Sequence, residues 1–284
     1  MTSLLALGAA AFYGAADFLG GIATRRATTV ATVLTTQAAG LLMLLACSPL
    51  MLDLVMSRRD LLFGVLAGLT GSVGVALMYK ALAIGPMSVV APVTAVCAVI
   101  VPLVVGLLQG ESITAAAAIG VAVAIGAIGL LGMAPAPAGD PSQPPADVTK
   151  GLRVALGSGV AIGGFLVTLG ETSAAAGLWP LAVSRAVSIA LFSTMAVVTR
   201  QALVVPRAAM IPAIACGGLD MVANALYLVA VRQGQLSLVA TLASLYPAST
   251  VLLARVVLGE RLGPWQQLGV AAAVVAIVLI VGNS

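Results

Sequence analysis

Ten long apolar runs, separated by short breaks of charge, Gly or Pro, restrict the fold of this chain more than any other feature. Hydrophobic residues fill 61% of its 284 positions and charged residues only 8%, far from the roughly 45–50% and 25% of soluble domains. Lipid offers no partner for backbone N–H and C=O groups, so a run of roughly 20 apolar residues is expected to be a helix. The predicted fold is therefore all-α, a polytopic membrane protein with ten transmembrane helices. The predicted spans are 3–23, 29–52, 61–83, 87–109, 113–133, 152–173, 177–199, 208–231, 236–258 and 264–282.

One long polar break, rich in Pro and Ala, occupies residues 134–150 and contains the chain midpoint. Such composition is typical of a linker. We therefore expect two units of five helices each, residues 1–133 and residues 151–284.

The two units are similar in sequence at a constant offset of 149 residues. Over positions 76–132 the offset gives 17 identities in 57 pairs, where chance predicts roughly six for this composition. Since each unit has an odd number of spans, the second must enter the membrane from the opposite side. The prediction is two inverted five-helix repeats, a plan that recurs in transporters with a site near the midplane.

The segments 81–112 and 230–261 carry the clearest shared pattern, a Gly turn followed by a helix that ends in Gly-Glu. They resemble the paired signature of the drug/metabolite transporter superfamily, EamA type. The second copy also has the Pro that such repeats place before Gly-Glu, Pro247, where the first has Ala98. The resemblance implies a ten-span carrier, often an exporter of amino acids or other small metabolites, with a central cavity lined by both halves. The matched residues are Gly85, Gly110 and Glu111 in the first copy and Gly234, Gly259 and Glu260 in the second.

Polar residues inside the spans are the candidates for function, because a charge at mid-bilayer costs at least about 2.5–3.5 kcal/mol. At about 1.5 Å of rise per residue, Asp220 lies near the middle of its span. Asn224 and Tyr227 follow at i+4 and i+7, on the same helical face. We interpret this stripe as lining a substrate cavity. A hydrogen-bonded seam between helices is the alternative.

Two further spans carry candidate charges. Tyr13 and Asp17 are spaced i and i+4 in the first span. The Asp17 carboxylate could bind a substrate amine or carry a coupling proton, and a structural ion pair is the alternative. Arg185, in the seventh span, has a guanidinium fork that suits a substrate carboxylate or one of these acids.

Four more residues complete the predicted site. Tyr79 and Lys80 lie near the end of the third span and could extend it, although a Lys at that depth usually reaches back to the surface. Ser244 and Tyr246 lie in the ninth span. Hydroxyls also serve as ordinary packing contacts between membrane helices, so their role stays open. Glu111 and Glu260 are expected to fix helix turns rather than to touch substrate.

The residue inventory argues against an enzyme. The chain has no His and no P-loop or GxSxG motif, so we expect no catalytic site, no metal and no cofactor. Asp17 and Asp220 are the only acids available for an intramembrane aspartyl pair. We expect a secondary transporter, driven by a gradient and coupled to protons through Asp17 or Asp220. Amino acids or similar zwitterions are the first substrate class. Organic cations or drugs are the alternative, and a non-transporting scaffold is a more distant one.

The expected partners are a small-molecule substrate, the lipid bilayer and protons, with no nucleic acid, and the expected state is a monomer or homodimer in the plasma (inner) membrane. Most of the 13 basic residues fall in loops or at span ends, which suits lipid head groups. Their distribution and the family resemblance disagree on orientation. Arg58, Arg59 and Arg232 share the side of the termini, against seven on the other side, which favours termini outside the cytoplasm. The resemblance favours termini inside. The seven are Arg25, Arg26, Lys150, Arg153, Arg200, Arg207 and Arg261.

Overall fold

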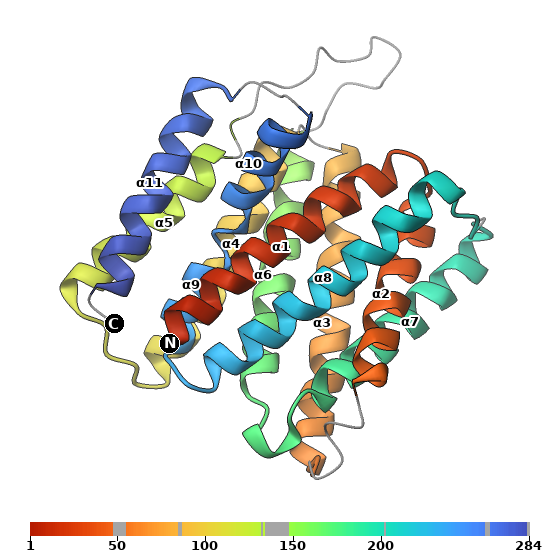
Figure 1. Ribbon diagram of the computed structural model, residues 1–284, viewed down its shortest axis with the longest axis horizontal. Coiled ribbons are helices and arrows are strands. Elements are labelled where there is room, and N and C mark those ends of the chain that lie inside the picture. Colours follow the sequence, from red (N-terminus) through yellow and green to blue (C-terminus); the bar gives the residue numbers. More distant parts are fainter. Residues whose placement is uncertain are drawn as a thin grey trace.

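The computed structural model describes residues 1–47, 55–84, 87–131, 133, 148–201, 203–258 and 262–282, and these form a bundle of helices (Figure 1). The predicted turn at Gly85, the Gly259–Glu260 pair and residues 134–147 of the predicted linker lie outside the described residues. The helices are α1 (Thr2–Thr24), α2 (Thr29–Ala46), α3 (Arg58–Ile84), α4 (Met87–Leu108), α5 (Ala115–Leu131), α6 (Val148–Gly170), α7 (Trp179–Thr199), α8 (Arg207–Val231), α9 (Leu236–Ala243), α10 (Tyr246–Leu258) and α11 (Pro264–Val281).

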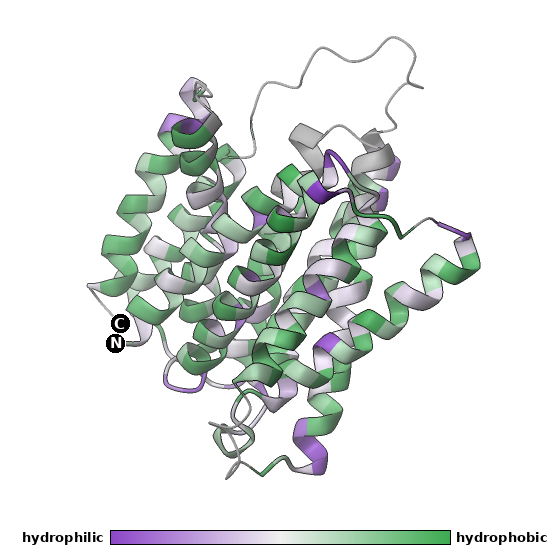
Figure 2. Cartoon of the chain, turned by 45° about the vertical axis from the view of Figure 1, so that its right-hand side comes forward, coloured by the Kyte–Doolittle hydropathy of each residue, from purple (hydrophilic) through white to green (hydrophobic). Residues whose placement is uncertain are grey.

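The helices have the length and surface of membrane spans. Eight segments of the described chain are apolar and long enough to cross a bilayer, and two shorter apolar segments, Val93–Leu108 and Ala115–Leu131, complete the set of ten. Large aliphatic side chains face outward, among them Val197 and Ile211, each 77% exposed. Figure 2 shows apolar residues along the helices and many of the hydrophilic ones at helix ends and loops. These features confirm the all-helical, ten-span prediction.

The ninth span is not the single helix that the sequence predicted. It consists of α9 and α10, which are separated by a turn at Ser244 and Leu245. Pro247 is the second residue of α10 and has no N–H to donate to a carbonyl one turn earlier. The break brings the backbone of Tyr246 against α1, because a Cβ built on Gly14 would lie 2.7 Å from the Tyr246 carbonyl oxygen.

Several predicted boundaries also move. The span predicted at 152–173 begins earlier, at Val148, and the one predicted at 177–199 begins at Trp179, after a short 3-10 turn at Ala174–Ala176. The fifth span is shorter than predicted, Ala115–Leu131. At the starts of the fifth and seventh spans, loop residues were apolar enough to be taken for helix, since hydropathy does not record where the backbone turns. At the start of α6 the error is the reverse, because the polar residues Thr149 and Lys150 are helical.

Helix starts repeat along the chain at the offset seen in the sequence. The helices α3 and α8 begin at 58 and 207, and α5 and α11 begin at 115 and 264, each pair 149 residues apart. The packing repeats as well: α1 packs against α8 as α6 packs against α3, and α5 pairs with α11. Figure 1 shows α5 and α11 side by side at one edge of the bundle. This is the packing that two inverted repeats would produce.

Two close contacts of glycines are also related by the 149-residue offset. A Cβ on Gly120 of α5 would lie 2.8 Å from Ile280 of α11, and a Cβ on Gly269 of α11 would lie 3.0 Å from Leu131 of α5. Gly269 is 149 residues after Gly120, and Leu131 is 149 residues before Ile280. The two contacts are therefore equivalent under the repeat. In both, a small residue lets the helix backbones approach closely, as is usual in membranes.

Polar contacts join the two halves at the end of the bundle that holds the termini. Glu111 accepts hydrogen bonds from the backbone N–H groups of Leu236 (2.5 Å) and Ser237 (3.0 Å) and so caps α9. Buried Asp60 accepts a bond of 2.6 Å from the backbone N–H of Ser173. Glu111 was expected to fix a turn, and it does so for a helix of the other half. These contacts hold the halves together below the central cavity.

Candidate functional site

A cavity of about 300 Å³ lies within the bundle, between helices of both halves. Its size is at the lower end for ligand pockets and suits a small metabolite. The α9–α10 turn and the first residue of α10 line the cavity. Side chains of eight further helices also line it: α1, α2, α3, α4, α6, α7, α8 and α9. Its polar lining residues are Tyr13, Asp17, Thr36, Gln37, Ser72, Ser184, Arg185, Ser188, Cys216, Asp220, Asn224, Ser244 and Tyr246.

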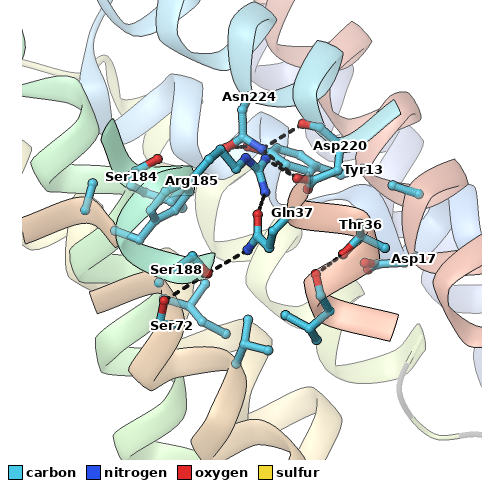
Figure 3. Close-up of a pocket in the computed structure, with 18 of the residues that line it drawn as sticks. Tyr13, Asp17, Thr36, Gln37, Ser72, Ser184, Arg185, Ser188, Asp220 and Asn224 are labelled. Atoms are coloured by element: carbon cyan, nitrogen blue, oxygen red, sulfur yellow. Dashed lines mark hydrogen bonds and ion pairs between the residues drawn. The ribbon is translucent and has the colours of Figure 1, made fainter. Parts of the chain in front are cut away.

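Arg185 is the centre of a polar network on one side of this cavity (Figure 3). Its guanidinium donates to the Asp220 carboxylate and to the side-chain carbonyl of Gln37. The Arg185 side chain is only 9% exposed, whereas that of Asp220 is 29% exposed. The cation is thus enclosed by its partners, and the carboxylate is the more accessible member of the ion pair.

Gln37 links Arg185 to two hydroxyls. Its amide nitrogen donates to the Ser188 hydroxyl at 2.9 Å, and the Ser72 hydroxyl lies 3.0 Å from that of Ser188. Because the amide group is held on both sides, its oxygen is fixed toward Arg185. This chain of bonds connects α2, α3 and α7 and orients the guanidinium.

Asn224 extends the network from Asp220 to α1. Its amide nitrogen donates to the Asp220 side chain at 3.2 Å and to the Asp220 backbone carbonyl at 2.7 Å. The Tyr13 hydroxyl donates to its side-chain oxygen at 2.9 Å. The Tyr13 ring in turn packs edge-on against Tyr246, with ring centroids 6.3 Å apart. The network therefore runs across the cavity wall from α3 to the start of α10.

Asp17 differs from Asp220 in its surroundings. It lies one turn beyond Tyr13 on α1, lines the same cavity and is exposed. Within the part of the chain that the structure describes, no hydrogen bond or ion pair engages its side chain. A carboxylate in this position is free to take a ligand cation or a proton.

The charges of the described lining do not balance. Two carboxylates, Asp17 and Asp220, face one guanidinium, Arg185, which leaves a formal charge of −1 when all three are ionised. An uncompensated charge in a membrane interior is costly. One positive charge, from a ligand or from a proton, would balance this lining.

Seven of the ten residues that the sequence nominated line this cavity: Tyr13, Asp17, Arg185, Asp220, Asn224, Ser244 and Tyr246. Tyr227 does not. It is fully buried, and its hydroxyl donates to the Leu166 backbone carbonyl at 3.0 Å, so it forms the helix seam that was the alternative interpretation. Lys80 is exposed near the end of α3 and away from the lining. The side chain of Tyr79 lies outside the described residues.

The sequence analysis did not identify the lining residues of α2, which are Thr36 and Gln37. It also missed the hydroxyls of Ser72, Ser184 and Ser188. Gln37 carried a usable signal, because it is the only amide in the predicted span 29–52 and an amide in lipid needs partners. The serines carried no such signal, since a single hydroxyl can bond its own helix backbone, as Ser184 does to Leu181 at 2.9 Å.

The fold and this cavity define a polytopic helical membrane protein with a partly polar compartment between two halves. The chain belongs to the EamA-like transporter family, whose sequence model matches residues 1–133 and again residues 149–282. Membership makes it a membrane transporter of small molecules by family and places it within the drug/metabolite transporter superfamily.

One solved structure, described only as "Crystal structure of protein", is similar over 98% of this chain and 95% of its own, with a TM-score of 0.78 and 16% sequence identity. At that identity the likeness concerns the fold alone. A comparison with curated protein sequences finds no match.

Proposed function

We propose that this protein is a secondary active transporter of small organic metabolites that carry a protonated amine, with amino acids and similar zwitterions as the first class. The observation that supports the proposal is the Asp17 carboxylate, which has no partner among the described residues and lies in a cavity whose described lining has a formal charge of −1. An ammonium group at Asp17 would balance that charge. The proposed setting is the plasma (inner) membrane, with transport directed outward.

Among the described lining residues, Arg185 is the one cation that a zwitterion's carboxylate could meet. Since Arg185 is enclosed and already bonded to Asp220 and Gln37, a substrate carboxylate would have to replace Asp220. Such an exchange would release Asp220 as a proton acceptor. Substrate binding at Arg185 would thus favour protonation of Asp220. At Asp17, by contrast, a substrate ammonium group and a proton would compete for one carboxylate, which is what proton-coupled exchange requires.

Organic cations are the second candidate, and the engaged state of Arg185 favours them. A ligand with an amine and no carboxylate leaves the Arg185–Asp220 pair intact and still balances Asp17. The two candidates are separated by paired ligands, an amino acid and the amine that remains after its decarboxylation. A zwitterion transporter prefers the former, and a cation transporter the latter.

The experiment is counterflow and pH-driven flux in proteoliposomes, with L-leucine, isoamylamine and N-acetyl-L-leucine as ligands. We expect flux of at least one amine-bearing ligand and none of the acetylated one. Asp17→Asn is expected to reduce that flux at least tenfold. Glu171→Gln is the matched control, because Glu171 pairs with Arg59 outside the cavity at 2.8 Å. Equal flux by Asp17→Asn and wild type, or transport of N-acetyl-L-leucine alone, would contradict the proposal.

A further inference from the structure

The cavity has a polar wall and an apolar wall. The helices α1, α2, α7 and α8 contribute the charged and amide groups. By contrast, α6 contributes only Ile162, Phe165 and Leu166, and α3 contributes small or apolar residues beside its one serine: Ala67, Gly68, Gly71, Val75 and Met78. Ser72 does not belong to the apolar wall, since its hydroxyl is bonded to Ser188 of α7.

The repeat makes this division informative. At the 149-residue offset Leu166 corresponds to Asp17, and Ile162 corresponds to Tyr13. In α3, Gly71 corresponds to Asp220 and Val75 to Asn224. The packing of the two halves is equivalent, so the backbone alone would give two similar walls. The chain instead places its polar groups in one wall and leaves the related positions of the other apolar.

Glycines set the shape of the apolar wall. A Cβ on Gly71 would lie 3.1 Å from Cδ2 of Phe165, and a Cβ on Gly74 would lie 2.6 Å from Cγ1 of Ile162. Both large side chains thus lie directly against the backbone of α3. Phe165 is half-buried and lines the cavity, so part of its ring is available to a ligand.

We infer that Phe165, with Ile162 and Met78, forms a subsite for an apolar tail, and that the protein selects substrates with an amine-bearing head and an unbranched or branched hydrocarbon side chain. The inference rests on the proposed function for the head of the substrate and adds the tail. Small polar metabolites would leave the apolar wall in contact with water. A hydrocarbon tail displaces that water while the head stays at Asp17.

The expected effect follows from the transfer of methylene groups out of water. Burial of one CH₂ contributes about 0.8 kcal/mol, which is roughly a fourfold gain in affinity. Along the series L-alanine, L-2-aminobutyrate, L-norvaline and L-norleucine, Kd is expected to fall about fourfold per step until the cavity is filled.

The test is isothermal titration of the protein in nanodiscs with three series of equal tail length: the amino acids above, the corresponding n-alkylamines and the N-acetylated amino acids. Phe165→Leu is expected to flatten the dependence on tail length, with a five- to tenfold loss for the longest tail and less than a twofold change for the shortest. Phe63→Leu is the matched control, because Phe63 lies under Arg59 at the far end of α3 and is absent from the lining. Phe165→Asn provides a second variant that keeps a side chain of moderate size and removes its apolar character.

The outcomes separate the two proposals. If amine-bearing ligands bind with affinity that does not depend on tail length, the tail subsite is refuted and the proposed function stands. If the tail dependence appears in the N-acetylated series only, the subsite stands and the amine-dependent function fails. Binding of no series, or a tail dependence that Phe165→Leu and Phe165→Asn both leave unchanged, overturns the inference.

Discussion

The ion pair between Arg185 and Asp220 offers the sharpest test of the site's energetics, through the substitution Asp220→Asn. Asparagine keeps the shape of the side chain and an oxygen that can accept from Arg185 and Asn224, and it removes the negative charge. The variant therefore leaves the geometry of the network in place and isolates the charge.

The magnitude follows from the enclosure of Arg185. Its side chain is 9% exposed, and within the described residues its polar contacts are Asp220 and the neutral Gln37. Removal of one partner of a buried ion pair costs about 3–5 kcal/mol, because the remaining charge is left uncompensated. The double variant Arg185→Gln with Asp220→Asn removes the guanidinium as well, so only the Asp17 carboxylate stays charged in the described lining. It should be more stable than Asp220→Asn alone, with a coupling energy of up to about 3 kcal/mol.

The assay is reversible unfolding in mixed micelles, by titration with SDS or by steric trapping in bicelles. The Arg59–Glu171 pair is the control, because Arg59 is 67% exposed and Glu171 is 24% exposed, with 2.8 Å between their charged groups. An exposed pair of this kind contributes about 0–1 kcal/mol. Glu171→Gln should thus have a small effect in the same measurement.

Two results would refute the reasoning. The first is a free energy of unfolding for Asp220→Asn within about 0.5 kcal/mol of wild type, the range of ordinary surface substitutions. The second is a double variant that is no more stable than the worse single variant. Either would show that Arg185 reaches water or lipid head groups and does not depend on Asp220.

Three further substitutions test the scaffold around the site, each by the same unfolding measurement. Glu111→Gln removes the charged acceptor that caps α9 and should cost about 0.5–2 kcal/mol, whereas Gln235→Ala at the same turn should cost less. Gly120→Ala places a Cβ 2.8 Å from Ile280 and should cost about 1–3 kcal/mol, while Gly126→Ala, with open space beside it, should be nearly neutral. Asp60→Asn should cost about 1–3 kcal/mol, since the buried carboxylate accepts from backbone and hydroxyl donors of two loops. Equal effects of either of the first two variants and its control would contradict these assignments, as would an effect of Asp60→Asn within about 0.5 kcal/mol of wild type.

The ten-span fold could be predicted from the sequence because lipid allows few solutions for a backbone. Apolar runs of sufficient length become helices, and the 149-residue offset fixed which helices are equivalent. The break at Ser244 was not predicted, although Pro247 marks it. A proline in a membrane helix can kink it or end it, and the neighbouring helices decide which.

The sequence identified the charged residues of the site. It did not show the role of residues whose function depends on which side chains of other helices they contact. Asp17 and Asp220 looked alike in sequence, as acids inside a predicted span. In the structure Asp220 is paired with Arg185, and no hydrogen bond or ion pair engages the Asp17 side chain among the described residues. Tyr227 shares a helical face with Asp220, yet its hydroxyl meets a backbone carbonyl of α6. Spacing along one helix cannot show which neighbour a side chain meets.

The two halves pack equivalently, but one contact at the end of the bundle that holds the termini is not repeated at the opposite end. Asp60 binds Ser173 across the halves there, and its counterpart 149 residues later is Ala209, which offers no acceptor. Inverted repeats exchange conformations when a carrier alternates between its two sides. If this chain alternates as the proposed function requires, its two ends would not be closed by the same bonds, and the two states would differ in free energy even without a substrate. A gradient or a ligand would then have to supply that difference, and the charged wall of the cavity, which is equally one-sided, is where a ligand would do so.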